Sequence, residues 1–318
     1  MHKASAANAA AVVDAAVSQG FVALRDALSA QLPAEAVTAA NALRAALPDW
    51  RCTGRFSQLG APFAAAIAAA EKALPRPVLV DTNRLLVTQL ALQLDSTWTD
   101  RRLTPELLDL VPGAASRLLS QLRAPADPDY VFPGDYFVKD LRFAAGLTVP
   151  GGAEVLDLRS KPGLRVLLHL LRRQPMPAHL RALLSASRAD PWFRIHTEKR
   201  YLRHFHEAGW DAFYRRVAGL LVLHPEVRGV VGTAWFFDPQ LDEVSPRLAY
   251  LRNPLARGAF LVAGRTSQFD IVSATTNSEA RKQLYEQGRY VPVPHTLVWP
   301  RQVLLQWARG QESNGPST

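Results

Sequence analysis

Gly229-Val-Val-Gly-Thr-Ala-Trp-Phe-Phe237 is a run rich in β-branched and aromatic residues, and the turn-forming pair Asp238-Pro239 follows it. Such a run between turn residues is typical of a β-strand. The chain repeats the pattern in four further segments, at residues 245–251, 258–263, 269–273 and 290–299. Helices are expected at residues 277–286, closed by Gly288, and at residues 300–308. The last third of the chain therefore predicts a sheet with helices beside it.

Upstream of this stretch, strand and helix patterns alternate. Three strands are expected around the turn Pro150-Gly151-Gly152, at residues 136–143, 147–149 and 154–158. Helical spacing follows in three segments, at residues 164–171, 179–185 and 196–224. The last of these is the longest, and a break or bend is expected in it at Gly209.

The first 124 residues have helical periodicity throughout. Apolar residues recur at intervals of three and four, alanine is abundant, and prolines stand near the expected helix ends. Helices are expected in residues 5–48, as two helices parted at Pro33, and at residues 62–74, 84–94, 104–110 and 114–122. The stretch Ala124-Pro-Ala-Asp-Pro-Asp129 cannot continue a helix and predicts a linker.

These patterns predict an α+β fold in two domains. An N-terminal helical domain is expected at residues 1–124, followed at residues 130–310 by a domain with a mixed or antiparallel sheet and flanking helices. Residues 311–318 are polar and predict a disordered tail. The length of 318 residues also exceeds the ~100–200 residues of one usual domain.

The composition is that of a globular protein with excess positive charge. The formal net charge is +9 and the pI is about 10.0, but most basic residues are arginines scattered singly or in pairs. This scatter favours solvated helix faces over a polyanion groove, so nucleic acid is a disfavoured partner that stays open. Cys52 is the single cysteine, which excludes an intramolecular disulfide and a zinc site of several thiolates.

The chain shows no pattern of export or membrane insertion. Its first residues lack the apolar core of a secretory signal and include Asp14. No apolar run approaches the ~18 residues of a membrane-spanning helix. Together with the lone cysteine, these features predict a soluble protein in the cytoplasm, and they leave the oligomeric state open.

Histidines and carboxylates gather in one short stretch: His196, Glu198, His204, His206, Glu207 and Asp211. If this stretch is one helix, His196 and His204 share a face with Arg200 between them. No two of these histidines then have the spacing of four that commonly binds a metal. The sequence therefore predicts no metal at this cluster.

Arginine and aromatic residues concentrate in the C-terminal part of the chain. The aromatics are Trp235, Phe236, Tyr250, Tyr285, Tyr290 and Trp299, and the arginines are Arg247, Arg252, Arg257, Arg281 and Arg301. Arginine offers a fixed set of donors to carboxylate or phosphate, so the mixture predicts a pocket for an anionic ligand. The alternative interpretation is a sheet packed by aromatics with arginines on its rim.

Asn277-Ser-Glu-Ala-Arg-Lys-Gln-Leu-Tyr-Glu-Gln-Gly-Arg-Tyr290 resembles the late strand–helix–strand unit of the GNAT acyltransferase superfamily. In that unit an Asn at a strand end precedes a helix ending Leu-Tyr-Glu-x-x-Gly-Phe. The strands expected at residues 229–237 and 245–251 stand for the family's central antiparallel strands, so the resemblance covers about residues 227–299. The family's pyrophosphate loop is missing, and Arg257-Gly258-Ala259 is only loosely like it.

The resemblance implies transfer of an acyl group from a CoA-type or carrier-bound thioester to a small amine or similar acceptor. It implies that Asn277 contacts the cofactor and that Tyr285 protonates the departing thiolate. The expected phosphate contacts, in place of the missing loop, are Arg257, Gly258 and Arg281. Three side chains are candidates for the base that deprotonates the acceptor: Glu198, His196 and Asp238.

Two functions follow from the sequence. The leading prediction is an acyltransferase-like enzyme that uses an acyl thioester and no metal. The alternative is a non-catalytic protein whose arginine- and aromatic-rich C-terminal surface binds a partner protein or nucleic acid. Nucleic-acid binding would weaken steeply with salt, which separates it from thioester binding in an enclosed pocket.

Overall fold

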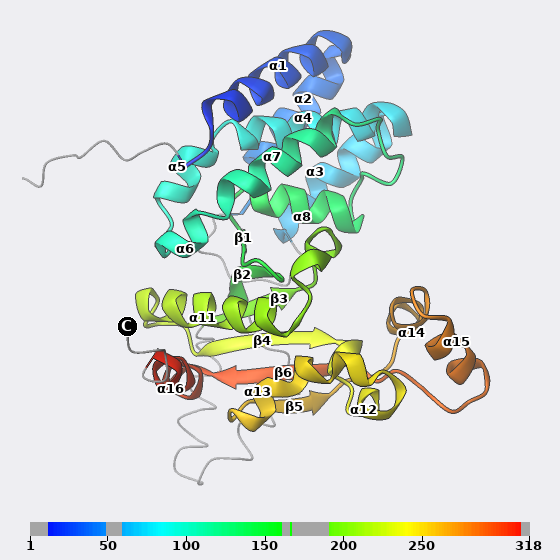
Figure 1. Cartoon of the computed structure of the whole chain (residues 1–318). Helices are drawn as coiled ribbons and strands as arrows, with labels where there is room; N and C mark the ends of the chain where they lie inside the picture. Colours follow the sequence, from blue (N-terminus) through cyan, green and yellow to red (C-terminus); the bar gives the residue numbers. More distant parts are fainter. Residues whose placement is uncertain (1–11, 49–58, 161–165, 167–190, 313–318) are drawn as a thin grey trace, which may run out of the picture. The chain divides into compact units, whose positions relative to one another are not determined.

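The fold is α+β, as the sequence predicted, with a helical first part followed by a six-stranded mixed sheet (Figure 1). The chain divides into two compact units, Met1–Pro150 and Gly151–Thr318. The computed structural model describes residues 12–48, 59–160, 166 and 191–312. Apart from Val166, the helices expected at residues 164–171 and 179–185 lie outside the described residues, as do Cys52 and residues 313–318.

The first unit consists of helices around one apolar core, as predicted. They are α1 (Ala15–Gln31), α2 (Ala34–Ala45), α3 (Gly60–Ala73), α4 (Arg76–Ala91), α5 (Leu94–Thr99), α6 (Pro105–Leu108), α7 (Val111–Arg123) and α8 (Asp135–Ala144). Helix α4 is central, since α1, α2, α3, α7 and α8 all pack against it. Pro33 and Pro75 are the N-cap residues of α2 and α4, where a missing amide proton costs nothing.

Residues 136–143 belong to helix α8, so the strand predicted there is wrong. Phe137, Val138 and Leu141 are buried at helical spacing, although the aromatic and β-branched content resembles a strand. Lys139 Nζ lies 2.6 Å from Asp135 Oδ2, one turn earlier in the same helix. Because α8 packs on α4, the first unit continues past the linker expected at residues 124–129 and ends at Pro150.

The sheet has the strand order β1-β2-β3-β4-β6-β5. Its strands are β1 (Thr148–Pro150), β2 (Val155–Ser160), β3 (Trp192–His196), β4 (Gly229–Ala234), β5 (Phe260–Ala263) and β6 (His295–Pro300). The pair β3–β4 is parallel, whereas β2–β3, β4–β6 and β5–β6 are antiparallel. A parallel pair needs a crossover, which α11 (Glu207–Leu223) provides.

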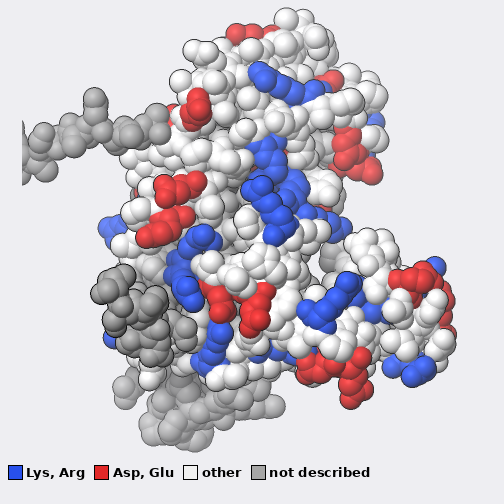
Figure 2. All heavy atoms as spheres, in the orientation of Figure 1, with Lys and Arg blue, Asp and Glu red and all other residues white. Residues whose placement is uncertain are grey.

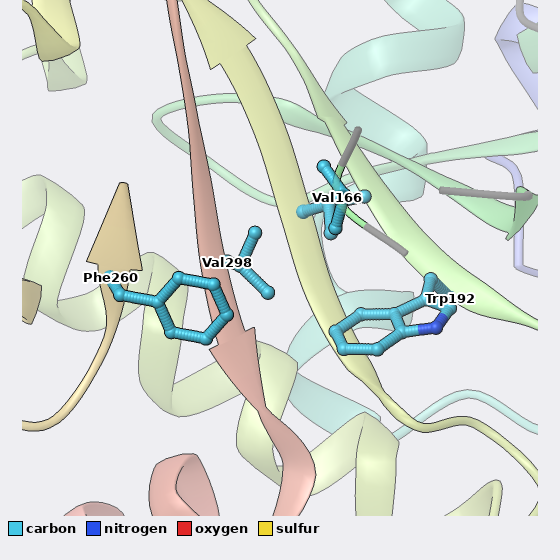
Figure 3. Packing of buried hydrophobic residues seen from close by; sticks show 5 residues of the cluster. Val166, Trp192, Phe260 and Val298 are labelled. Carbon is cyan, nitrogen blue, oxygen red and sulfur yellow. The ribbon is translucent and has the colours of Figure 1, made fainter. Parts of the chain in front are cut away.

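The two faces of the sheet have different coverings. Trp299 of β6 contacts Tyr214 of α11 and Trp307 of α16 (Arg301–Glu312), so these two helices cover one face. The opposite face carries the apolar cluster in Figure 3, which consists of Val166, Trp192, Val231, Phe260 and Val298. Alternate residues of one strand therefore belong to different cores.

Several strands predicted after residue 146 are confirmed. The hairpin strands β1 and β2, strands β4 and β5, and the extended segment that ends in β6 lie where the sequence placed them. The two helices predicted after residue 276 are also found, as α15 (Glu279–Glu286), with Gly288 at its C-terminal end, and α16. Helix α16 reaches Glu312, so the first residues of the expected tail are helical.

Two other strand predictions are wrong. Residues 245–251 lie in the 3-10 helix η3 (Pro246–Arg252), which begins with a proline at its first position. Residues 269–273 lie in α14 (Gln268–Thr275), where Ser267 and Asp270 form a reciprocal capping box. That box satisfies amide donors at the helix start and outweighs the strand-like run of apolar residues.

Two further segments are shorter or more divided than predicted. The strand expected to reach Phe237 ends at Ala234, and a 3-10 helix, η2 (Trp235–Phe237), follows it. The helical stretch expected at residues 196–224 contains the end of β3, the 3-10 helix η1 (Lys199–His204) and α11. The histidines of that stretch therefore lie on three different elements.

Candidate functional site

The two arginines that the sequence assigned to a cofactor are held by protein groups. Arg257 donates to both carboxylate oxygens of Asp211, at 2.6 and 3.3 Å, and its guanidinium lies 4.8 Å from the centre of the Trp307 ring. Arg281 is 4% exposed and donates from Nε to the Ala274 carbonyl at 2.6 Å. Burial lowers the pKa of Arg281. Both side chains serve packing in the described structure.

The other two expected cofactor contacts do not form a phosphate cradle. Gly258 has a φ of +91°, and a β-carbon there would lie 2.6 Å from the Val303 side chain. The chain continues from Gly258 into strand β5, so no helix start presents amides at this place. Asn277 is exposed in the turn between α14 and α15, and it follows a helix where a strand end was expected.

Tyr285 lies in an insertion between β5 and β6. Helices α14 and α15 form this insertion, which Figure 1 shows beyond the carboxyl end of β4. Its two ends are tied together where Gly264 N donates to the Pro294 carbonyl at 2.7 Å. Arg281 anchors it from within, since its Nη1 donates to Ser245 Oγ at 3.1 Å. Tyr285 itself is half-buried on α15.

The three candidate bases have different surroundings. Glu198 is 2% exposed, and Arg200 donates to its two oxygens at 2.9 and 2.7 Å. Asp238 is 1% exposed and accepts from the amides of Gln240 and Val293. The side chain of His196 is 17% exposed, and its Nε2 lies 3.8 Å from Asp157 Oδ2. Of the three, His196 is the most accessible to a substrate.

The sequence pattern picked out His204 and His206 but not the two arginines, Arg203 and Arg216, whose charges act on His204. The group, here called the α11 cations after its two arginines, consists of Arg203, His204 and His206 just before α11 and of Arg216 within the helix. His206 is the N-cap of α11, and its Nδ1 accepts from the Gly209 amide at 3.2 Å. Arg203 Nε donates to His204 Nε2 at 3.0 Å. Burial lowers the pKa of His204, and the charges of Arg203, His206 and Arg216 lower it further.

The geometry at the start of α11 leaves donors for a ligand. Because Nδ1 of His206 accepts a hydrogen bond, the hydrogen of its neutral ring lies on Nε2, which is a free donor in the described structure. Gly209 allows the His204 carbonyl to come so close that a β-carbon would collide with it. The acidic residues Glu207 and Asp211 of α11 are already paired with Asn253 and Arg257.

Tyr250 of η3 lies beside the same loop. Its hydroxyl donates to the carbonyl of Phe205 at 2.8 Å, directly before the N-cap residue of α11. Burial, and then the charge of the buried Glu154, raise the pKa of Tyr250 to about 12. The Tyr250 hydroxyl therefore stays protonated near neutral pH and can donate a hydrogen bond. The sequence named Tyr250 as one of the C-terminal aromatics, but its contact with Phe205 could not be predicted because the two residues are far apart along the chain.

The remaining expectations concern charge, metals and membranes. On the face shown in Figure 2, Lys and Arg form separate patches with acidic patches between them. The described part of the chain contains no group of three or more potential metal-binding side chains. Among its helices, none combines the length and apolar character that crossing a membrane requires.

Comparisons with protein-family models, with curated proteins and with solved structures found no match to this chain. The function is therefore inferred from the geometry of the second unit. That geometry brings the α11 cations and Tyr250 together at the start of α11, and it leaves Tyr285, Asn277, Arg257 and Arg281 in other places.

Proposed function

We propose that this protein is an enzyme that transfers an acyl group from a CoA-type or carrier-bound thioester to a small amine or similar acceptor. The observation that carries the proposal is the α11 cations at the N-terminus of a long helix. Because α11 follows β3, its N-terminus lies at the carboxyl edge of the parallel pair β3–β4. Ligands of sheets with such crossovers bind at this edge.

The α11 cations fit the phosphates of the thioester carrier. The positive end of a helix dipole and its unpaired amides favour phosphate, and Arg203 and Arg216 add fixed positive charge. The only hydrogen bonds found for these two arginines in the described residues run to His204 and to the Gly151 carbonyl. We assign to this place the role that the sequence gave to Arg257, Gly258 and Arg281.

Tyr250 takes the role that the sequence gave to Tyr285. The acceptor nitrogen attacks the thioester carbonyl, a C–N bond forms, and the C–S bond breaks with its electron pair on sulfur. The proton that the nitrogen loses ends on this sulfur, so the products are an amide and a free thiol. With its raised pKa, the Tyr250 hydroxyl stays protonated, and it stabilises the developing thiolate when its single O–H turns from the Phe205 carbonyl to the sulfur. Its position beside Phe205 places it close to a carrier bound at the start of α11. No metal takes part in this scheme.

The test is thermal unfolding with millimolar CoA, acetyl-CoA or inorganic phosphate. A ligand that binds only the native state raises the Tm by mass action, so CoA and acetyl-CoA should raise it above the shift seen with phosphate. The matched variant Arg203→Ala should lose most of the CoA-dependent rise. Equal Tm values with and without CoA would reject a CoA carrier.

The single Cys52 fits a reducing compartment, and we propose that the reaction takes place in the cytoplasm.

A second candidate function has an observation of its own. Phe269 and Val272 of α14 are 78% and 49% exposed, one turn apart on the same helix. Exposed apolar residues on a projecting element favour a non-catalytic protein that binds a partner protein. If CoA and acetyl-CoA leave the Tm unchanged, this candidate gains weight, and a salt titration then separates a protein partner from nucleic acid.

A further inference from the structure

We propose that Arg247 and Arg281 bind a carboxylate of the acceptor, so that the acceptor is a small amine of the amino-acid class. This inference rests on the proposed acyl transfer and names its second substrate. Arg281 is 4% exposed, and it forms no ion pair with a carboxylate of the described residues. A guanidinium buried without an anion is unfavourable, so a bound carboxylate would complete the site.

The hydrogen bonds of Arg281 leave donors for a ligand. Its Nε donates to the Ala274 carbonyl at 2.6 Å and its Nη1 to Ser245 Oγ at 3.1 Å, whereas Nη2 has no partner among the described residues. Cζ of Arg281 lies 4.7 Å from the centre of the Trp235 ring, which covers one face of the guanidinium. These contacts hold the group in one position, and a fixed guanidinium suits a planar carboxylate.

Arg247 supplies a second and accessible cation. It is exposed on η3, two residues after Ser245, and it has no hydrogen bond or ion pair with another described residue. Burial lowers the pKa of Arg281, and the charge of Arg247 lowers it further, so the two guanidinium groups lie close together. Two neighbouring positive charges repel each other, and a carboxylate bound to both relieves that repulsion.

Tyr290 adds a buried hydroxyl beside the same arginine. Tyr290 is 1% exposed, and its hydroxyl has no hydrogen-bond partner within the described part of the chain. Burial and the charge of Asp238 raise the pKa of Tyr290, while the charge of Arg281 acts in the opposite direction. The Asp238 carboxylate already accepts from the amides of Gln240 and Val293. The Tyr290 hydroxyl, which stays protonated, can therefore donate to a ligand held by Arg281.

This carboxylate site lies beside the proposed thiolate partner. Residues three apart in a 3-10 helix lie one above the other, so Arg247 and Tyr250 share a face of η3. Trp235 follows β4 directly, and the next residue, Phe236, packs against the ring of Phe205. The Phe205 carbonyl accepts from Tyr250. A small acceptor can thus have its carboxylate at Arg247 and its amine at the thioester carbonyl. The carboxylate takes no part in the bond changes.

The first experiment measures binding without CoA. Nitrogen NMR of the full chain follows the Nε–H signal of Arg281, which Arg281→Lys assigns, during titration with glycine or with glycinamide. Glycine should shift this signal with a saturating curve, and glycinamide, which lacks the carboxylate, should not. Arg247→Ala should weaken glycine binding by about 10-fold. The matched control is Arg265→Ala, because Arg265 is an exposed arginine at the start of the α14–α15 insertion, and it should bind glycine as the wild type does.

Two results of this titration would overturn the inference. One is a signal of Arg281 that glycine does not move, and the other is an unchanged affinity for glycine in Arg247→Ala. Aminomethylphosphonate has a phosphonate in the place of the glycine carboxylate, so tighter binding of this compound than of glycine would assign the site to a phosphate group instead.

The second experiment separates this inference from the proposed function. Transfer from acetyl-CoA is measured to each common amino acid and to the corresponding amide. At least one amino acid should have a kcat/KM about 10-fold above that of its amide, and Arg247→Ala should bring the two within about twofold by raising the KM for the acid. Arg247→Ala should bind CoA as the wild type does. Tyr290→Phe should also raise the KM for the acid.

The outcomes for the acceptor and for the carrier are independent. Amides that react as well as the acids would show that no carboxylate is recognised, and the proposed acyl transfer would still stand. A failure of CoA to raise the Tm of the wild type would reject the proposed function, whereas the glycine titration would still decide whether Arg247 and Arg281 bind a carboxylate.

Discussion

Two groups of basic side chains in the second unit differ in what they contact. Arg252, Arg257 and Arg281 are each held by a carboxylate, a carbonyl or an aromatic ring, and Arg252 forms its closest contact with Asp242. Arg203 and Arg216 of the α11 cations have only a histidine nitrogen and a carbonyl as partners in the described residues. The density of arginine along the chain therefore indicates packing. Cations without carboxylate partners indicate where a ligand anion can bind.

The largest expected effect is a loss of stability when Arg281, an arginine held by protein groups, is replaced. Arg281→Ala removes two hydrogen bonds and the stacking on Trp235, and it leaves the Ala274 carbonyl without its donor. Loss of such a buried side chain should lower the free energy of unfolding by about 3 kcal/mol. This corresponds to a fall in Tm of about 6–12 °C. Thermal unfolding measures it, with Arg203→Ala as the control that should leave the Tm within about 1 °C. Similar falls in Tm for Arg281→Ala and Arg203→Ala would show that the two groups of basic side chains do not differ in their contribution to stability.

The second prediction concerns the two tyrosines. Tyr250→Phe should keep the fold and lower kcat by about 100-fold, because the proposed hydrogen bond from Tyr250 to the developing thiolate can no longer form. Tyr285→Phe should leave kcat within about twofold, since Tyr285 lies on the α14–α15 insertion. Steady-state transfer from acetyl-CoA measures both. If Tyr285→Phe is the slow variant, the role assigned by the sequence resemblance is right and Tyr250 is structural.

The sequence predicted the first unit better than the second, because the signals that mark its helices lie within short windows of sequence. Helices α1 to α4 are marked by prolines at their ends and by apolar spacing, which are signals within one short window. Phe269, Ile271 and Val272 are strand formers, so the composition of residues 269–273 predicts a strand. The Ser267 and Asp270 capping box decided the outcome, and it was available in the sequence.

The candidate site was only partly predictable, because its residues meet through the sheet register. The sequence named His196 and Glu198, which lie two residues apart at the end of β3. It could not name Asp157, since the nearness of Asp157 to His196 depends on which strands pair and in what register. Tyr250 comes from η3, a segment predicted as a strand, so its side chain had no predicted direction.

The third prediction tests the α11 cations directly. Arg203→Ala should weaken CoA binding by about 10-fold, because one charge close to the carrier phosphates is lost. Arg247→Ala is a suitable control, since Arg247 is exposed on η3, where its charge is felt by Arg281. Isothermal titration with CoA at two salt concentrations measures both affinities. Equal affinities in wild type and Arg203→Ala would place the carrier away from α11.

The smallest expected effect is a pH dependence of stability that comes from His204. Burial and the charges of Arg203, His206 and Arg216 hold its pKa below the usual value, so the unfolded chain binds the proton first as the pH falls. Stability should therefore fall as the pH drops below about 6.5, toward the lowered pKa of the folded state. Urea unfolding at pH 7.5 and 5.5 should show a smaller loss of the free energy of unfolding for His204→Gln than for wild type.

A bound phosphate anion would offset the surrounding positive charge. CoA should therefore reduce the pH-dependent loss of unfolding free energy in wild type and leave that of His204→Gln unchanged. The same loss in both proteins would show that another group governs this pH range, and it would weaken the view that the α11 cations are an unneutralised group awaiting an anion.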